Sequence, residues 1–270
     1  MTYNFYQRLL KYVVILLLVS VAAPLRAETT LPRLELGMAL SALTAPDYRG
    51  SAERSSGVIP IPYIKYRGEK FRIDEGVQGL LVNTPAWQVS LSGNFTLAVD
   101  EDNPERQGMD KLAPTLEIGP SVNYRFHSTQ TGAWWLDLPL RFSFTLNRDF
   151  DHVGQVFSPR LSWRKPARRL GQWKLRFSIG PVFASQGHHD YFYSVAPHEA
   201  TAARPAFDAP GGYSGLRSEL TLSRRLGRYW FGSFFRYDNM TDSEIEDSPL
   251  VSDTEAWVAG IGLGYVLFEE

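Results

Sequence analysis

The feature that constrains this chain most is a strict alternation of apolar and polar residues, which returns along almost its whole length. From Leu136 to Leu146 every even-numbered residue is apolar, whereas Asp137 and Arg141 are among the residues between them. Successive side chains of a β-strand point to opposite faces of the sheet. The segment therefore predicts a strand with one apolar face and one polar, charged face. The same pattern recurs in residues 87–99, 115–126, 173–183 and 257–267.

The length of these segments bears on the kind of sheet that they form. They run for about 10–16 residues, whereas strands of soluble proteins usually have ~5–6 residues and a tilted membrane strand needs ~9–11. A soluble β-sandwich also has alternating strands. The segment length, the charge on the polar faces and an N-terminal export signal favour an all-β fold, an antiparallel transmembrane β-barrel. Its apolar faces would meet lipid, and its polar faces would line the lumen.

The connections between the predicted strands alternate between short and long. Outer-membrane barrels have short periplasmic turns and longer external loops, and two periplasmic termini require an even number of strands. Eleven strand segments are evident, and a division of residues 69–83 at the turn-like residues 74–76 makes twelve, with ten as the alternative. Short turns are expected at residues 67–69, 83–85, 127–132, 166–171 and 227–228, and long loops at 44–56, 100–111, 188–212 and 241–254.

The tryptophans give a separate indication of the barrel ends. Membrane barrels carry girdles of aromatic residues where the strands leave the hydrocarbon layer. We therefore expect a girdle at the short turns from the six tryptophans that lie within about five residues of one, which are Trp87, Trp134, Trp135, Trp163, Trp173 and Trp230.

Two prolines, Pro60 and Pro62, fall within the second predicted strand. A proline in a sheet belongs at a bulge or an edge, because it has no N–H to give to the ladder. We expect a distorted strand there.

The N-terminus has the pattern of an export signal. Arg8 and Lys11 precede an apolar run over residues 12–23, which is shorter than the ~20 residues of a membrane-spanning helix. Ala27 is a small residue suited to a cleavage site. We expect a signal peptide over residues 1–27, export through the Sec pathway, and a barrel over residues 28–270 in the outer membrane.

The composition argues against several kinds of function. Basic and acidic residues are balanced, 28 against 29, whereas nucleic-acid binding calls for a basic excess. The chain has no cysteine, which excludes disulfides, thiol catalysis and thiolate metal sites. No catalytic or phosphate-binding motif is present, so we predict a non-enzymatic protein with no cofactor and no metal site. The clusters His188–Asp190 and Asp149–His152 are interpreted as solvated loops.

Two groups of charged residues are candidate functional sites. A basic cluster on a predicted periplasmic turn would attract an acidic partner by electrostatic steering, with a merely solvated turn as the alternative; it consists of Arg164, Lys165, Arg168 and Arg169. A second group is expected on the lumen-facing sides of the strands, where buried charges must be paired. Its residues are Glu117, Arg125, Asp137, Arg141, Arg176, Arg217, Glu219, Arg236 and Asp238. Such a network would either plug the lumen or line a narrow pore, and both alternatives stay open.

Five stretches, in their order and spacing, give the chain a family resemblance. They are residues 37–51 with Asp47–Tyr48–Arg49–Gly50–Ser51, Val58–Ile64 with its two prolines, the loop over 191–209, Asp247–Val251 and Gly262–Tyr265. The chain resembles the MipA/OmpV family of outer-membrane proteins in these stretches, over essentially the whole mature sequence. One departure is at the C-terminus, where Leu267 stands at the position of the family's closing aromatic residue and three residues run past it.

The resemblance implies an outer-membrane barrel in contact with lipid and lipopolysaccharide. One family member is described as a scaffold that joins a murein-degrading transglycosylase to a murein synthase, and others are associated with adhesion or permeability. We therefore expect a scaffold whose partners are periplasmic murein enzymes. A small-solute pore and an adhesin that acts through the long loops are the alternatives, because a fold does not by itself fix a function.

Overall fold

The wall of the molecule is one antiparallel β-sheet. The computed structural model describes residues 31–68, 71–73, 77–96, 98–99 and 103–270, and the predicted signal peptide with its cleavage site lies outside them. The strands are β1 (Leu34–Pro46), β2 (Arg54–Arg67), β3 (Phe71–Ile73), β4 (Val77–Asn83), β5 (Trp87–Thr96), β6 (Thr115–Ser128), β7 (Ala133–Thr145), β8 (His152–Phe157), β9 (Arg160–Lys165), β10 (Trp173–Ala184), β11 (Gly212–Leu226), β12 (Tyr229–Asn239) and β13 (Glu255–Glu269). The described loops hold two short helices, η1 (Pro104–Arg106) and α2 (Gln186–Tyr193). Neither is long and apolar enough to cross a membrane.

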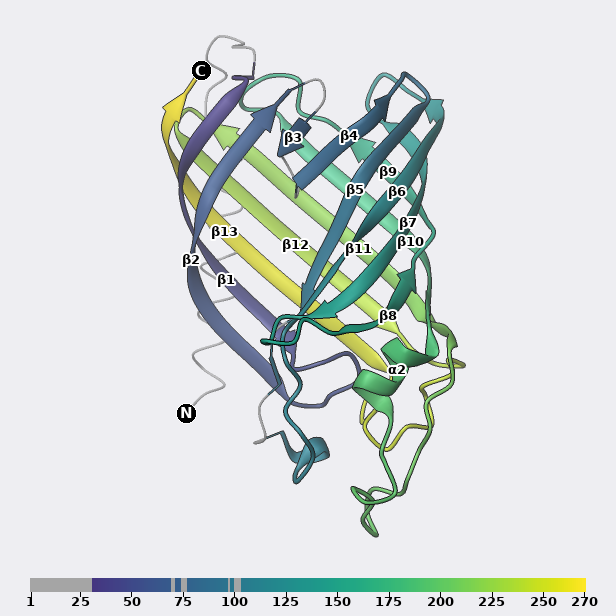
Figure 1. Ribbon diagram of the computed structural model, residues 1–270. Helices are drawn as coiled ribbons and strands as arrows, with labels where there is room; N and C mark the ends of the chain where they lie inside the picture. The colour runs from purple at the N-terminus through teal and green to yellow at the C-terminus, as the bar shows by residue number, and fades with distance from the viewer. Residues whose placement is uncertain (1–30, 69–70, 74–76, 97, 100–102) are drawn as a thin grey trace.

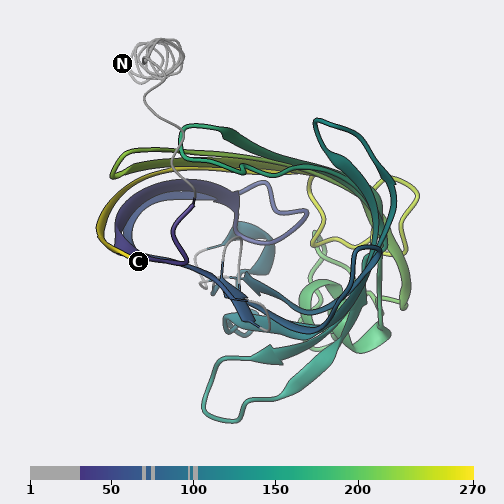
Figure 2. The ribbon, with the colours of Figure 1, turned by 90° about the horizontal axis from the view of Figure 1, so that it is seen from above.

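The sheet closes on itself to form a barrel. Met38 of β1 pairs with Pro62 of β2 on one side and with Tyr265 of β13 on the other, and the remaining strands pair in chain order (Figure 1, and seen from above in Figure 2). β8 and β9 are two halves of one barrel strand, because both pair with β7 and both pair with β10. The wall therefore has twelve strands, which confirms the predicted barrel and the preferred strand number.

The segment 69–83 is divided as the sequence predicts. β3 and β4 pair with each other as a short antiparallel hairpin, whereas the turn expected at residues 74–76 lies outside the described residues. β2 pairs with β3 only at Tyr66 and Arg67, and β5 pairs with β4 only between Gln88 and Ser90.

One interval of the wall consequently lacks strand pairing. Residues 54–65 of β2 and 91–96 of β5 border this interval, on the cap side of the short hairpin (Figure 1). Within the described part of the chain no strand pairs with those two edges. In Figure 1 the far strands β11 and β12 are visible through this interval. We call it the side opening.

Pro60 and Pro62 lie on the edge of the side opening. β2 pairs with β1 along its whole length without a register shift, so the distortion expected there is absent. The unpaired edge is the physical reason that the strand accepts two prolines, since a missing N–H breaks no ladder on that side.

The outer surface of the barrel is apolar. On β13 the outward side chains of Trp257, Leu263 and Leu267 are 39%, 54% and 62% exposed, whereas the inward side chains of Val258 and Val266 are 7% and 1% exposed. The other strands expose leucine, isoleucine, valine and phenylalanine in the same alternating way. A continuous apolar surface of this kind suits lipid rather than water.

Two of the tryptophans expected in the outer girdle face the lumen instead. Trp135 is 7% exposed, and the guanidinium carbons of Arg164 and Arg125 lie 4.6 and 5.7 Å from its ring centre. The ring of Trp230 packs against Tyr63 with 5.4 Å between the ring centres. The girdle prediction is wrong for these two residues because both stand in the inward phase of their strands.

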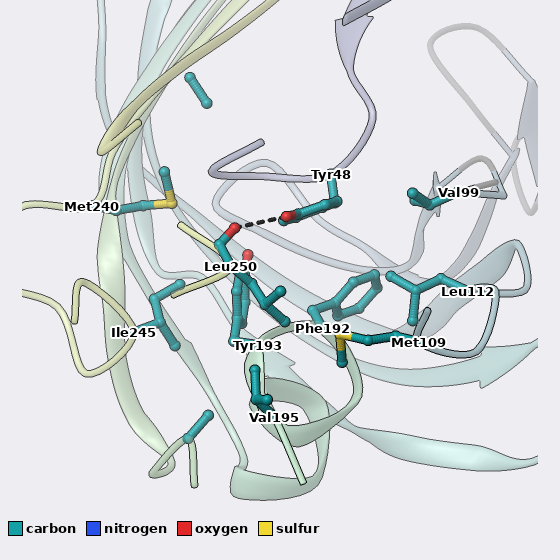
Figure 3. Close-up of a cluster of buried hydrophobic side chains, with 12 residues drawn as sticks. Tyr48, Val99, Met109, Leu112, Phe192, Tyr193, Val195, Met240, Ile245 and Leu250 are labelled. Carbon is teal, nitrogen blue, oxygen red and sulfur yellow. Dashed lines mark hydrogen bonds between the residues drawn. The ribbon is translucent and has the colours of Figure 1, made fainter. Parts of the chain in front are cut away.

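The long loops form a cap with a hydrophobic core of its own. The described cap residues are 47–53, 98–99, 103–114, 185–211 and 240–254, and they lie together at one end of the barrel (Figure 1). Met240, Ile245 and Leu250 are fully buried, and Figure 3 shows them in one cluster with Phe192 and Tyr193. We call this assembly the loop cap and the opposite end of the barrel the short-turn end. The connection 146–151 at the cap end is short, so loop lengths do not alternate throughout.

Hydrogen bonds join the separate segments of the loop cap. Tyr48 Oη donates to the carbonyl of Leu250 (2.7 Å), Tyr193 Oη donates to the carbonyl of Arg49 (3.0 Å), and Ser248 Oγ donates to the carbonyl of Tyr193 (2.7 Å). A buried carbonyl without a partner costs about 1–3 kcal/mol. These hydroxyl groups therefore stabilise the closed arrangement of three loops.

His188 and His189, which were expected in a solvated loop, belong to α2. The Oγ of Ser185 accepts a hydrogen bond from the backbone N–H of His188 and so caps the helix. His189 is 0% exposed, and its ring nitrogens lie 2.6 Å from the carbonyl oxygen of Pro210 and 3.0 Å from Ser214 Oγ. The expectation is wrong because the long segment folds back into the loop cap, where His189 is fully buried and His188 is partly buried.

Candidate functional site

A buried aspartate at the cap-side half of the lumen holds three arginines. The Nε atoms of Arg217, Arg236 and Arg49 lie 2.7, 3.3 and 3.5 Å from carboxylate oxygens of Asp238. Arg217 and Asp238 meet because they are directly opposite in the β11–β12 register, and Arg236 is two residues from Asp238 on the same face of β12. Arg49 reaches the same carboxylate from the loop cap, so the barrel wall and the cap share this site.

Two further ion-pair groups continue the charged layer around the lumen. Asp137 of β7 pairs with Arg164 and Arg160 of β9, and Arg160 also lies 3.3 Å from Glu219 of β11. The Nε atom of Arg141 of β7 lies 3.0 Å from a carboxylate oxygen of Glu117 of β6. Removal of one partner from a buried pair leaves an uncompensated charge, and the alternation of the strands places all these charges on the inner face.

The structure brings together most of the residues that the sequence placed in the lumen. Ion pairs join seven of them, and Arg176 interacts electrostatically with Asp137. Arg125 lies apart, against the ring of Trp135.

Three arginines of the layer lie outside the set expected in the lumen: Arg49 and Arg160 were not expected in a site, and Arg164 was expected in the basic turn. Arg49 is in a loop without periodicity. Arg160 and Arg164 alternate with Leu161 and Trp163 in β9. This pattern identifies both arginines as inward residues once residues 160–165 are recognised as the second half of a strand.

The charged layer carries an excess of positive charge. We call it the arginine band; among the described residues it comprises Arg49, Arg141, Arg160, Arg164, Arg176, Arg217, Arg236, Glu117, Asp137, Glu219 and Asp238. Seven arginines face four carboxylates, which leaves three positive charges in excess. A lumen with this balance favours an anion.

Two cavities lie on opposite sides of the arginine band. The loop-side cavity has a volume of about 570 Å³ and includes Arg217 and Val182 in its lining. The turn-side cavity has a volume of about 220 Å³ and includes Ser223 and Lys174. No residue lines both cavities. Along β11 and β10 the band residues Glu219 and Arg176 stand between them.

The turn-side cavity is strongly basic. Glu35 lies near its rim and accepts hydrogen bonds from Arg67 (2.5 Å) and the hydroxyl of Tyr63 (2.7 Å). It also forms an ion pair with Arg225, whose Nη1 lies 2.6 Å away. The cationic residues of its lining are Lys65, Arg67, Arg72, Arg169, Lys174, Arg224 and Arg225.

The predicted basic turn is only partly a surface cluster. Arg168 and Arg169 are exposed at the short-turn end, and Lys165 is partly buried. Arg164 turns into the lumen, where it pairs with Asp137 and stacks on Trp135. The reason is that Arg164 still belongs to β9, in the inward phase, whereas Arg168 and Arg169 follow the end of the strand.

Burial in the loop cap changes the pKa of His188 and so its protonation near neutral pH. Burial lowers the pKa of His188 from its ordinary 6.5 to about 4, against the opposing effect of Glu117. The opened cap would then bind more protons than the closed cap between these two pH values, so the stability of the closed cap falls as pH falls through this interval. We expect amide hydrogen exchange in α2, corrected for intrinsic rates, to quicken from pH 7 to pH 5. The variant His188→Gln should show a weaker pH effect, and an identical response in both proteins would contradict this assignment.

Comparison with known proteins places the chain in a family. Residues 38–267 match a family described as MltA-interacting protein MipA. No curated protein matches the chain. A bacterial polysaccharide outer membrane secretin is similar at 10% identity and a TM-score of 0.45, over 87% of this chain and 99% of that one. For OprG from Pseudomonas aeruginosa the identity is 8%, the TM-score 0.23 and the coverage 90% and 98%; for OprD from the same organism the values are 7%, 0.28, 90% and 96%.

The family match covers most of the chain, and the architecture agrees with it. A closed antiparallel wall with an apolar outer face, a charged lumen and long loops at one end is the form of an outer-membrane barrel. The chain therefore belongs to the MipA family and is a twelve-stranded β-barrel of the outer membrane.

Proposed function

We propose that this protein is a non-enzymatic scaffold that holds periplasmic murein enzymes at the outer membrane, with the short-turn end as the contact surface. The observation that carries the proposal is the concentration of basic side chains at that end. The family description names an interaction with MltA, which supports a murein transglycosylase as one partner. Short turns lie on the periplasmic side in barrels of this class, so this surface would face the murein layer.

The basic surface is continuous from the turn into the mouth of the barrel. Arg168 and Arg169 are exposed on the turn, and Arg33 and Arg228 are exposed at the same end of the barrel. The turn-side cavity opens among further cationic residues, while its carboxylate Glu35 is already neutralised by two arginines. A surface of this sign raises the association rate of an acidic partner and makes binding dependent on salt.

Site-specific cross-linking in cells tests the proposal. A photoreactive phenylalanine analogue is introduced at Gln130 or at Ala167, both in turns of the short-turn end, and at the exposed Asp149 at the cap end as a matched control. These sites leave the arginines in place. We expect murein transglycosylase or synthase in the cross-linked products from positions 130 and 167 and not from 149. Recovery that is equal at all three positions, or no murein enzyme at any, would refute the scaffold function.

A further inference from the structure

The loop-side cavity is covered at two of its ends. The loop cap contributes Tyr48, Phe192 and Tyr193 to its lining, and these residues belong to the packed core of the cap. Towards the short-turn end the arginine band separates it from the turn-side cavity. The remaining direction is sideways, towards the side opening between β2 and β5.

The lining residues show that the cavity reaches the outer face of the wall through the side opening. Gly57 and Ile59 of β2 stand in the inward phase, with Tyr63, and line the cavity. Ser56 of β2 and Phe95 of β5 stand in the outward phase and line it too. Residues of both phases can share one cavity only where it passes around the edge of a strand. In agreement, residues 54–60 of β2 are exposed on both faces.

The cavity combines an apolar wall with a cationic floor. Its apolar lining includes Leu43, Ile59, Val156, Val182, Phe234 and Val258. Its basic lining residues Arg49, Arg217 and Arg236 share the carboxylate of Asp238. Its other acidic lining residues are Glu117, which pairs with Arg141, and Asp47, which accepts from Ser55 and Asn103. The volume of about 570 Å³ falls in the ~300–1,000 Å³ range of small-molecule sites.

We propose that the loop-side cavity binds a single-chain amphiphile with an anionic head, the chemical class of a fatty acid, which enters from the membrane through the side opening. The hydrocarbon chain would lie along the apolar wall at the height of the lipid. The head would lie against Arg49, Arg217 and Arg236, where the excess positive charge of the arginine band compensates it. This site is separate from the surface proposed for murein enzymes, and either proposal can fail without the other.

A titration with a fluorescent fatty acid tests the site. The full-length mature barrel is placed in phosphatidylcholine nanodiscs and titrated with cis-parinaric acid, with empty nanodiscs as the background. We expect a saturable component of one molecule per barrel that oleate displaces and methyl oleate does not. Absence of a saturable component above the background, or equal displacement by the acid and its ester, would overturn the proposal.

A pair of adjacent substitutions separates the cavity from the lipid surface. An added Cβ at Gly57 meets no atom within 4 Å, so a larger side chain has room to leave the backbone there. Gly57→Trp directs an indole into the cavity, whereas Val58→Trp places the same side chain on the outer face. We expect Gly57→Trp to weaken binding about tenfold or more, the equivalent of about two buried methylenes, and Val58→Trp to change it less than about twofold. Ser55→Trp, on the same face as Gly57, repeats the test if Gly57→Trp does not fold. Equal effects of the inward and outward substitutions would contradict the site.

The charge of the head is tested by Arg236→Gln. Asp238 keeps two arginine partners in this variant, so its buried carboxylate stays compensated. Loss of one charge-assisted hydrogen bond should weaken parinarate binding by about tenfold or more. Unchanged affinity would show that Arg236 does not receive the head and would overturn the assignment of the cationic floor.

Discussion

Replacing Asp238 with asparagine is expected to lower the free energy of unfolding of the barrel by about 3–5 kcal/mol, the usual cost of removing one member of a buried ion pair. The carboxylate is 1% exposed and is shared by Arg217, Arg236 and Arg49. Asparagine keeps the shape of the side chain, removes the charge and replaces one acceptor oxygen with an NH2 donor. Three guanidinium groups then face one another in a lumen that already has an excess of positive charge. Urea unfolding of the barrel in detergent micelles, followed by tryptophan fluorescence, measures the change.

Two control variants show whether the charge is responsible. Asp253→Asn alters an exposed aspartate of the loop cap, and we expect a change within about 0.5 kcal/mol, as for most surface substitutions. The double variant Asp238→Asn with Arg236→Gln removes one charge of each sign and should recover part of the lost stability. Equal stability of Asp238→Asn and Asp253→Asn would mean that the arginine band is not a buried network.

Replacing Leu250 with alanine is expected to open the loop cap. Leu250 is 0% exposed in the core of the cap, and its carbonyl accepts from Tyr48. Truncation of a buried leucine costs about 2–5 kcal/mol. If the cap opens as a unit, even 2 kcal/mol raises its open population by about thirtyfold.

Limited trypsin digestion reads out this opening. Arg106 of the loop cap is 6% exposed and donates to the carbonyls of Phe192 (3.3 Å) and Asp110 (3.4 Å), so it is protected while the cap is closed. We expect cleavage after Arg106 to quicken about thirtyfold or more in Leu250→Ala while the barrel strands stay intact. Leu146→Ala, at an exposed leucine of the short connection 146–151, should leave the rate unchanged. Similar rates in both variants would mean that the loops do not share one core.

The barrel itself could be predicted because strand residues obey a period. The inward phase of Asp137, Arg217 and Asp238 follows directly from their outward apolar neighbours, and their partners follow once neighbouring strands are paired. Misplaced side chains mark the limit of this reasoning. Trp135 and Trp230 are assigned to the girdle by their distance from a turn. The alternation of inward and outward residues along β7 and β12 instead places both side chains in the lumen.

The loop cap could not be predicted in the same way. Its core joins residues that are far apart in the sequence, such as Tyr48 and Leu250, whose hydrogen bond spans 202 positions, and no period connects them. The contact of Arg49 with Asp238 and the burial of His189 depend on that packing. The side opening could be predicted only in part. The division of residues 69–83 into two short strands follows from the sequence, but the unpaired edges of β2 and β5 become evident only from the strand pairing of the structure.

The most direct test of the scaffold function is an equilibrium titration of the purified barrel, in nanodiscs, with a purified periplasmic murein transglycosylase. Arg168→Glu with Arg169→Glu reverses two exposed charges at the short-turn end, and Lys111→Glu with Arg148→Glu reverses two at the cap end for the same change in net charge. We expect the first pair to weaken binding about tenfold or more, with a loss that shrinks at high salt, and the second pair to leave the affinity unchanged. Equal affinities for both double variants, or no binding by the unaltered barrel, would contradict the scaffold function.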